Sequence, residues 1–352
     1  MYNKDKNTIA ILVVGGGKMG LSHLALASEY VGKKNVVLCD TKVSTRIIFR
    51  LLGYKTFADV EKAASTIVQL GGVLIATPTP SHARLAKWAI TKGLPCFIEK
   101  PLTLDVNANT ELKSLATAKG VSVQVGFVLR YVASFQRLRH LMQSKCLGSM
   151  IGYTASMRGN VIFKPPADGG WQGDYKKGGG CLNEYGPHII DLCQFIFGVI
   201  DLINEVRMTQ VFCSKADDRI DFSCVHRNGG TGKVQIDWCD TGKRKSVVEF
   251  KVKFEHADVR VDNSAVEINW NKDCRFPLDR RLQIDAPIRP SNVAYYLRGE
   301  EFSLELEEFL GKCVGHRLSV DDSSPTNTTA RLEDGCEVDC LIDEIARKAG
   351  LK

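Results

Sequence analysis

The sequence lacks any long uninterrupted hydrophobic segment. No run of roughly 18 residues is both apolar and free of charge, which is about the length that a membrane-spanning helix needs. Residues 1–6 carry charges and lack an apolar segment followed by small residues, so the sequence predicts no secretory signal. We therefore expect a cytoplasmic protein that does not bind membranes.

The 12 cysteines form no metal-binding or disulfide pattern. No pair has the spacing C-x-x-C, and Cys336 and Cys340, which are one helical turn apart, have no histidine pair near them in sequence. Cys39, Cys96 and Cys224 lie in apolar runs, where a reduced cysteine behaves as a small hydrophobic residue. These positions indicate free thiols in a reducing compartment and no metal site.

Internal repeats, low-complexity tracts and long basic blocks are also missing. The net charge of +7 is compatible with a surface of mixed charge or with attraction of phosphorylated or nucleotide-linked substrates. No aromatic-rich basic segment accompanies it, so we expect no binding to nucleic acids.

A change of pattern near residue 126 predicts two domains in this chain of 352 residues. Before it, short apolar runs alternate with helix-like stretches such as residues 81–92, which is typical of parallel βαβ construction. The apolar runs are residues 9–14, 36–39, 73–76, 96–98 and 121–125. Residues 1–126 are therefore expected to form an α/β domain with a parallel sheet.

Residues 127–352 follow a different pattern, in which strands succeed one another without helices between them. Strands are predicted at residues 150–158, 205–212, 221–226, 233–238 and 247–254. Helices are predicted at residues 132–143, 182–197, 300–311 and 334–348. This order favours a second α/β domain with a large, mostly antiparallel open sheet.

A glycine-rich turn follows the first predicted strand. Residues 15–20 read Gly-Gly-Gly-Lys-Met-Gly and fit G-x-G-x-x-G at the head of a helix. Such glycines let backbone N–H groups approach a pyrophosphate, and the helix N-terminus favours its negative charge. We therefore predict a Rossmann domain whose cofactor-binding residues include Gly15, Gly17, Lys18, Met19, Gly20 and, at the end of the second strand, Asp40.

Asp40 favours NAD over NADP. Its carboxylate can accept hydrogen bonds from ribose hydroxyls and would repel the additional phosphate of NADP. Lys42 and Arg46 lie close by in sequence and could weaken this discrimination, so both cofactors stay open. The structural alternative is a solvated acid at a strand end.

Three further segments have the order and composition of one known family. Residues 76–82 read Ala-Thr-Pro-Thr-Pro-Ser-His, residues 99–101 read Glu-Lys-Pro, and residues 178–191 read Gly-Gly-Gly-Cys-Leu-Asn-Glu-Tyr-Gly-Pro-His-Ile-Ile-Asp. With the glycine turn they resemble the glucose–fructose oxidoreductase and inositol dehydrogenase family, often called Gfo/Idh/MocA. The resemblance covers nearly the whole chain. It implies an NAD(P)-dependent oxidoreductase that acts on a sugar, a cyclic polyol or a nucleotide sugar.

Lys100, Glu184 and His188 are the predicted catalytic residues. Lys100 follows a parallel strand, and the resemblance implies that its ammonium group reaches the nicotinamide and stabilises charge on the reacting oxygen. Glu184 and His188 are four positions apart, so a helix places both on one face. Histidine titrates near neutral pH, and the resemblance assigns the general base to His188. The family usually has aspartate where this chain has Glu184, whose carboxylate reaches one methylene further.

Each of these residues has a structural alternative as well. A lysine at a strand end can be solvated, and a histidine near a helix start can be packed or act as a cap. By resemblance, the peptide bond before Pro101 is expected to be cis. The triple glycine of residues 178–180 indicates close backbone approach to a ligand or unusual dihedral angles.

The resemblance extends the two binding sets. To the cofactor-binding residues it adds Thr77, Pro78, His82, Glu99 and Lys100. The predicted substrate-binding residues are Lys100, Arg130, Arg158, Trp171, Glu184 and His188. A tryptophan in a loop can stack on a sugar ring, although a buried structural role is equally compatible with the sequence.

Two other functions remain open for this fold. Some members of the family cleave glycosides by transient oxidation with tightly held NAD, and others are non-catalytic regulators that sense sugars or nucleotides. Retention of Lys100 and His188 argues against a sensor, which has no need of a proton-transfer pair. The resemblance also implies a homodimer or homotetramer joined through the second domain's sheet, which would cover an otherwise exposed apolar face.

Overall fold

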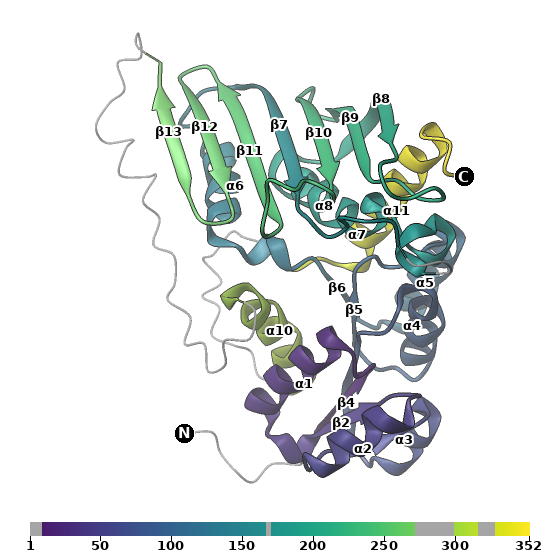
Figure 1. Ribbon diagram of the computed structural model, residues 1–352. Helices are drawn as coiled ribbons and strands as arrows, with labels where there is room; N and C mark the ends of the chain where they lie inside the picture. The colour runs from purple at the N-terminus through teal and green to yellow at the C-terminus, as the bar shows by residue number, and fades with distance from the viewer. Residues whose placement is uncertain (1–8, 167–169, 272–298, 316–327) are drawn as a thin grey trace. The chain divides into compact units, whose positions relative to one another are not determined.

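The computed structural model describes residues 9–166, 170–271, 299–315 and 328–352 (Figure 1). Its internal contacts divide the chain into two compact units. The first comprises Met1–Val128 and Ser291–Cys336, and the second comprises Leu129–Pro290 and Glu337–Lys352. Each unit is built around one β-sheet.

The sheet of the first unit has six parallel strands in the order β3-β2-β1-β4-β5-β6 (Figure 1). Their bounds are β1 Ala10–Val14, β2 Val36–Cys39, β3 Lys55–Phe57, β4 Leu70–Ile75, β5 Cys96–Glu99 and β6 Val123–Gly126. All five residues of β1 are buried, as expected for a strand covered by helices on both faces. The strand order reverses direction between β1 and β4, and sheets of this kind bind ligands at the carboxyl ends of strands at such a point.

The helices of the first unit follow the expected alternation with strands. They are α1 Lys18–Val31, α2 Val43–Leu51, α3 Val60–Thr66, α4 His82–Thr91, α5 Val106–Lys119 and α10 Glu300–Cys313. Helix α3 begins after Asp59, whose carboxylate accepts from the backbone N–H of Glu61 at 2.9 Å and so caps the helix.

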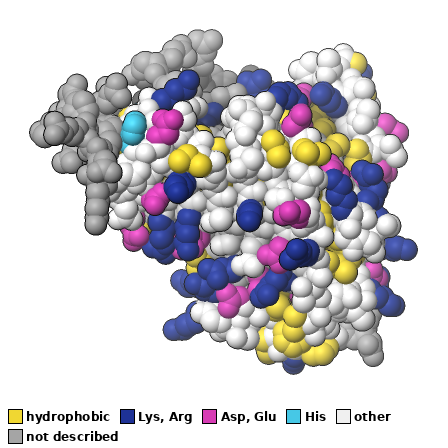
Figure 2. Space-filling model, turned by 90° about the horizontal axis from the view of Figure 1, so that it is seen from above, with side chains coloured by type: hydrophobic (Ala, Val, Ile, Leu, Met, Phe, Trp, Pro, Cys, Tyr) yellow, Lys and Arg dark blue, Asp and Glu magenta, His cyan; other side chains and the backbone are white. Residues whose placement is uncertain are grey.

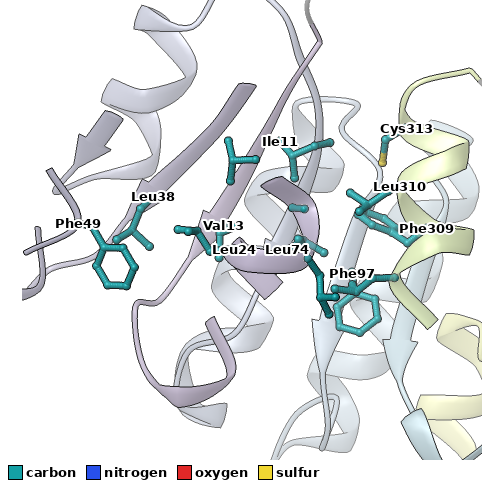
Figure 3. Packing of buried hydrophobic residues seen from close by; sticks show 14 residues of the cluster. Ile11, Val13, Leu24, Leu38, Phe49, Leu74, Phe97, Phe309, Leu310 and Cys313 are labelled. Atoms are coloured by element: carbon teal, nitrogen blue, oxygen red, sulfur yellow. The ribbon is translucent and has the colours of Figure 1, made fainter. Parts of the chain in front are cut away.

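Helix α10 packs into the core of the first unit although it follows the second unit's strands in sequence. Phe309 lies with its ring centroid 5.9 Å from that of Phe97 on β5. Figure 3 shows Phe309, Leu310 and Cys313 of α10 beside side chains of the sheet that include Ile11, Leu74 and Phe97. A single boundary at residue 126 does not anticipate this return of the chain, which is driven by burial of the apolar face of α10.

The sheet of the second unit has seven strands in the order β13-β12-β11-β7-β10-β9-β8 (Figure 1). The bounds are β7 Met150–Arg158, β8 Ile200–Thr209, β9 Arg219–His226, β10 Thr231–Asp237, β11 Val247–Phe254, β12 Ala257–Asp262 and β13 Val266–Trp270. Neighbouring strands are antiparallel except β7 and β10, which pair in parallel. The predicted α/β fold with one parallel and one mostly antiparallel sheet is confirmed.

One face of this sheet packs against helices. Along β7 the buried residues Tyr153, Ala155 and Met157 alternate with more exposed ones, and the ring of Tyr153 stacks on that of Phe197 at a centroid distance of 4.0 Å. The helices of the second unit are α6 Ala133–Ser144, α7 Cys181–Glu184 and α8 Gly186–Phe197. The last helix, α11 Leu332–Lys348, contains the division between the two units.

The other face of the seven-stranded sheet is polar. A shallow hollow on it is lined by outward-pointing residues that include Thr154, Ser156, Lys233, Gln235, Glu249 and Lys251. Arg260 bridges three strands there, with its Nε 2.8 Å from Glu249 and its Nη1 3.2 Å from Glu267. The side of the protein that is seen from above in Figure 2 carries charged side chains of both signs, with apolar groups between them. The expectation of an apolar sheet face is therefore wrong, and the homodimer or homotetramer stays a prediction without that support.

Most predicted elements lie within a few residues of the observed ones, with one break and three omissions. The single helix predicted at residues 182–197 is interrupted at Tyr185, because Pro187 has no N–H group and fits only in the first turn of a new helix. Strands β3, β12 and β13 were not among the predicted strands. Strand β3 has only three residues, too few for a visible alternation.

Candidate active site

The glycine turn after β1 forms an open backbone cradle. Gly15 has a φ of +97°, and a Cβ there would lie 2.6 Å from the carbonyl oxygen of Ala76. A Cβ on Gly20 would lie 1.8 Å from Gly15 O, so the helix can approach the turn only with glycine at both places. Helix α1 starts at Lys18 without a side-chain cap, and a Cβ on Gly17 would meet nothing within 4 Å. The turn thus fits the phosphates of a dinucleotide.

Asp40 lies beside this turn. Its Oδ2 accepts a hydrogen bond from Gly16 N at 2.7 Å, and its Oδ1 accepts one from Lys42 N at 2.7 Å. The Nη1 of Arg46 donates to the backbone oxygens of Asp40 and Thr41, both at 2.7 Å. The predicted cofactor residues Gly15, Gly17, Lys18, Met19, Gly20 and Asp40 therefore lie together at the ends of β1 and β2.

His82 connects two segments of the predicted cofactor loop. Its Nδ1 lies 3.0 Å from Pro101 O and its Nε2 lies 2.8 Å from Thr77 O. Burial lowers the pKa of His82, and a neutral ring has one N–H, so only one of these contacts is a hydrogen bond at a time. A cofactor contact through either ring nitrogen would have to displace one of these carbonyl groups.

The segment of residues 99–101 follows at the end of β5. The peptide bond between Lys100 and Pro101 is cis, as predicted. The side chain of Glu99 lies with its Oε1 2.6 Å from Nε2 of His23 on α1. Burial disfavours the charged form of Glu99, but the hydrogen bond from His23 and the positive charge of Lys100 help to outweigh it, so the pKa of Glu99 lies below its ordinary value.

Glu184 and His188 occupy the accessible edge of an otherwise buried segment in the second unit. Both are half-buried, while every other residue between 181 and 193 is buried. His188 follows the break at Tyr185, and its N–H donates to Tyr185 O at 3.1 Å, which keeps the two side chains one turn apart. Because the two residues lie on either side of this break, in α7 and α8, a shared face stays a prediction.

Asp217 anchors the start of that segment, and the sequence reasoning missed it. Its Oδ2 accepts from Leu182 N at 2.7 Å and from Cys181 Sγ at 3.0 Å, and its backbone oxygen accepts from Cys181 N at 3.0 Å. The side chain is fully buried, and burial raises its pKa. In the sequence, Asp217 and Asp218 are two adjacent acids before a strand, a pattern that is typical of a solvated turn. No motif therefore distinguishes Asp217 as a buried residue.

The triple glycine is explained by the protein's own packing. Gly178 and Gly180 have φ values of +87° and +92°, which confirms the predicted unusual dihedral angles. A Cβ on Gly180 would lie 2.2 Å from Asp217 Oδ1, and one on Gly179 would lie 2.2 Å from Trp171 O. At Gly179 and Gly180 the backbone therefore approaches other parts of the protein closely, which accounts for glycine there without a ligand.

We expect Asp217→Ala to destabilise the protein by about 1–3 kcal/mol, because it removes the acceptor for two buried donors. Asp217→Asn retains an acceptor and should cost less. The folded state raises the pKa of Asp217, so ionisation of its carboxyl group lowers the stability of the wild-type protein. The free energy of unfolding of the wild type should therefore fall relative to that of Asp217→Asn as pH rises from about 4 to about 7. Urea unfolding of the wild type and the two variants at several pH values measures these free energies. If the difference between the wild type and Asp217→Asn did not change with pH, the predicted pH dependence would be wrong.

The remaining predicted substrate residues differ in exposure. Arg130 is buried in an ion pair with Asp191 of α8, with its Nε 2.9 Å from Oδ2. Arg158 is partly exposed and lies 3.7 Å from Asp240. Trp171 is 50% exposed, which excludes the buried structural role. Direct substrate contact by all three stays a prediction.

Other expected properties concern thiols, metals and membranes. The cysteines within the described ranges are all free, and Cys274 lies outside those ranges. The described residues include no group of three or more His, Cys, Asp or Glu side chains suited to a metal ion. None of the helices in the described part of the chain is long and apolar enough to cross a bilayer.

The parallel sheet with its open glycine turn defines a dinucleotide-binding protein of the Rossmann type. Residues 9–127 match an oxidoreductase family with an NAD-binding Rossmann fold, and residues 135–260 match the GFO/IDH/MocA C-terminal domain. The chain belongs to the Gfo/Idh/MocA family.

Individual relatives extend this comparison. The chain is 30% identical over 148 residues to inositol 2-dehydrogenase of Pseudarthrobacter chlorophenolicus, which covers 41% of this chain and 44% of that protein. It is 26% identical over 231 residues to the rhizopine catabolism protein MocA of Rhizobium meliloti, covering 64% and 69%. The first alignment thus spans less than half of the relative's own length.

Solved structures share the fold across almost the whole chain. The WlbA dehydrogenase of Bordetella pertussis, in complex with NADH and UDP-GlcNAcA, has a TM-score of 0.77 at 16% identity and covers 98% of this chain and 96% of its own. Levoglucosan dehydrogenase in complex with NADH has a TM-score of 0.78 at 17% identity, with 98% and 97% covered. At these identities the likeness shows the fold.

Proposed function

We propose that the protein is an NAD-dependent dehydrogenase that transfers a hydride between the cofactor and a CH–OH group of a sugar, cyclic polyol or nucleotide sugar. The observation that carries this proposal is the accessible pair Glu184 and His188 on an otherwise buried segment. Relatives named as inositol 2-dehydrogenases and neighbours that bind NADH support the same interpretation.

Three side chains carry the proposed chemistry. His188 removes the hydroxyl proton as the carbon loses its hydride, and Lys100 stabilises the negative charge that develops on the oxygen. Glu184 orients the substrate from the same edge as His188. A bound NAD would supply the acceptor for the hydride. In the reverse direction His188 returns the proton to the alkoxide.

The two domains predicted from the sequence take separate roles in this proposal. Residues 1–126 bind NAD through the glycine turn, Asp40 and the segments of residues 77–82 and 99–100. Residues 127–352 bind the substrate through Arg130, Arg158, Trp171, Glu184 and His188 and mediate assembly into a homodimer or homotetramer. We also place the protein in the cytoplasm, which the free thiols support.

A substrate panel tests the function. Purified protein is incubated with polyols, aldoses and nucleotide sugars, with NAD and NADP in parallel, and absorbance of the reduced nicotinamide is recorded. The proposal expects NADH to accumulate with at least one class of compound. Glycoside cleavage without accumulation of NADH would instead favour the net hydrolytic reaction. Tight NADH binding with no turnover on any compound would favour a sensor.

We expect Asp40→Ser to reduce the preference for NAD over NADP by about tenfold or more, because a hydrogen bond to a charged group contributes roughly 1.5–3 kcal/mol. The substitution removes the carboxylate at 2.7 Å from Gly16 N and leaves Arg46 near the same strand end. Dissociation constants from quenching of protein fluorescence by NADH and NADPH measure the ratio. Asp59→Ser, at the cap of α3, is the matched control, and an unchanged ratio in Asp40→Ser would contradict the assignment.

A further inference from the structure

The buried histidine at the start of α4, His82, has a ring that the proposed chemistry does not use. Its two ring nitrogens lie against carbonyl oxygens of two different segments, with Nε2 2.8 Å from Thr77 O and Nδ1 3.0 Å from Pro101 O. Thr77 follows β4 and Pro101 follows β5, and these two strands are neighbours in the sheet of the first unit. The ring therefore joins the loops at the carboxyl ends of two adjacent strands.

The loop after β4 borders the glycine turn. A Cβ on Gly15 would lie 2.6 Å from Ala76 O and 3.1 Å from Thr77 Cγ2, so these two residues form a wall of the turn. The hydroxyl of Ser81 donates to Thr77 Oγ1 at 2.6 Å and closes the loop from its other end. A shift of Thr77 would thus alter the place that is expected to receive the phosphates of the cofactor.

The turn after β5 carries the predicted catalytic lysine. Pro101 directly follows Lys100, so its carbonyl group belongs to the backbone from which the lysine side chain projects. Residues 101–103 are all buried, and buried backbone groups need hydrogen-bond partners within the protein. A displacement of about 1 Å at a reacting group can cost about 10²-fold in rate. The contact from His82 to Pro101 O is therefore placed where it can affect turnover.

We propose that His82 is a positioning residue: its Nε2 holds the loop of Thr77 for cofactor binding, and its Nδ1 holds the turn of Lys100 and Pro101 for hydride transfer. This inference rests on the proposed function, in which both segments bind NAD. Both ring nitrogens face the protein's own carbonyl groups, so the ring acts on the cofactor through the two loops. Because a neutral ring has one N–H, the two contacts use the same proton in alternate tautomers.

Amide side chains can separate the two contacts. The amide nitrogen of asparagine lies near the place of Nδ1, and that of glutamine near the place of Nε2. His82→Asn thus keeps a donor for Pro101 O, His82→Gln keeps one for Thr77 O, and His82→Leu keeps neither. Thr103→Val is the matched control, because it removes a buried hydroxyl beside the same turn that lies 2.7 Å from Asn109 Oδ1 of α5.

Hydrogen–deuterium exchange of the full-length protein, read by mass spectrometry, measures the order of the two loops without any substrate. We expect His82→Asn to exchange about threefold to tenfold faster than wild type over residues 76–81 and at the wild-type rate over residues 99–104. His82→Gln should show the reverse, and His82→Leu should exchange faster in both segments. The factor is that by which one neutral hydrogen bond shifts an equilibrium constant.

Cofactor binding and turnover should divide in the same way. We expect His82→Asn to raise the NADH dissociation constant about threefold to tenfold and to keep kcat at saturating NAD within about twofold of wild type. His82→Gln should lower kcat about tenfold or more and bind NADH within about twofold of wild type. Thr103→Val should leave both quantities within about twofold. A histidine that only stabilised the fold would not produce this crossed pattern.

Three results would overturn the proposal. Wild-type exchange of both loops in His82→Asn and His82→Gln would show that the loops keep their places without the ring. Faster exchange of both loops in both variants would assign the effect to a general loss of packing. Equally weakened NADH binding in the two variants with unchanged kcat would show that the ring itself contacts the cofactor. If His82→Leu does not fold, the two amide variants carry the comparison. A chain that oxidises nothing in the substrate panel leaves the exchange and NADH measurements intact, so the two failures are distinguishable.

Discussion

His188→Ala is expected to lower kcat by about 10² or more, because general acid–base catalysis by a positioned side chain contributes about 10²–10⁴-fold. His188 is half-buried at the start of α8, on the edge that it shares with Glu184, and the cofactor cradle belongs to the other unit. NADH binding should therefore persist within about threefold of wild type. Initial rates on the best compound of the panel and fluorescence titration with NADH measure the two quantities.

The control for His188→Ala is a substitution of another histidine, one that lies outside the segment of residues 181–193. His256 lies between β11 and β12 in the same unit, and His256→Ala should retain most of the wild-type turnover. Equal turnover in His188→Ala and wild type would reject the general-base assignment. A parallel loss of turnover and of NADH binding would instead show a disturbed fold.

Much of the fold could be predicted because its signals are local. Strands β2, β7 and β11 coincide with the predicted ranges, since buried strands are apolar runs and half-buried strands alternate. The omission of β12 was avoidable, because Ala257, Val259 and Val261 alternate with polar residues. The return of α10 to the first unit was not visible, because no local pattern states which of two cores an apolar helix face will join.

The candidate site shows the same division. Lys100, Glu184 and His188 stand in contiguous motifs, so the sequence identifies them directly. Asp217 and His23 act through contacts with residues that are 35 and 76 positions away, and neither stands in a motif that the resemblance provided. A histidine on an apolar helix face is a signal that could have identified His23, whereas the acids at residues 217–218 carry none.

Lys100→Met is expected to lower kcat by about 10²–10³, the usual cost of removing one preorganised group that stabilises a developing oxyanion. Methionine retains an unbranched apolar stem, so the turn before the cis proline should keep its packing while the ammonium is lost. Lys100→Arg keeps the positive charge but spreads it over a planar group, and it should recover only part of the rate. Initial rates at saturating NAD compare the variants.

Lys92→Met controls for loss of a lysine from the first unit, because the Lys92 Nζ pairs at the surface with Glu61 and lies outside the predicted site. It should turn over at the wild-type rate. If Lys100→Met also did so, the lysine would have no part in hydride transfer. If Lys100→Met lost only cofactor affinity, the ammonium would serve binding alone, and stabilisation of the alkoxide would have to come from another donor. We expect kcat to fall while NADH binding is unchanged. This result would mean that the Lys100 ammonium stabilises the transition state, in which negative charge develops on the substrate oxygen, more than it stabilises the bound cofactor.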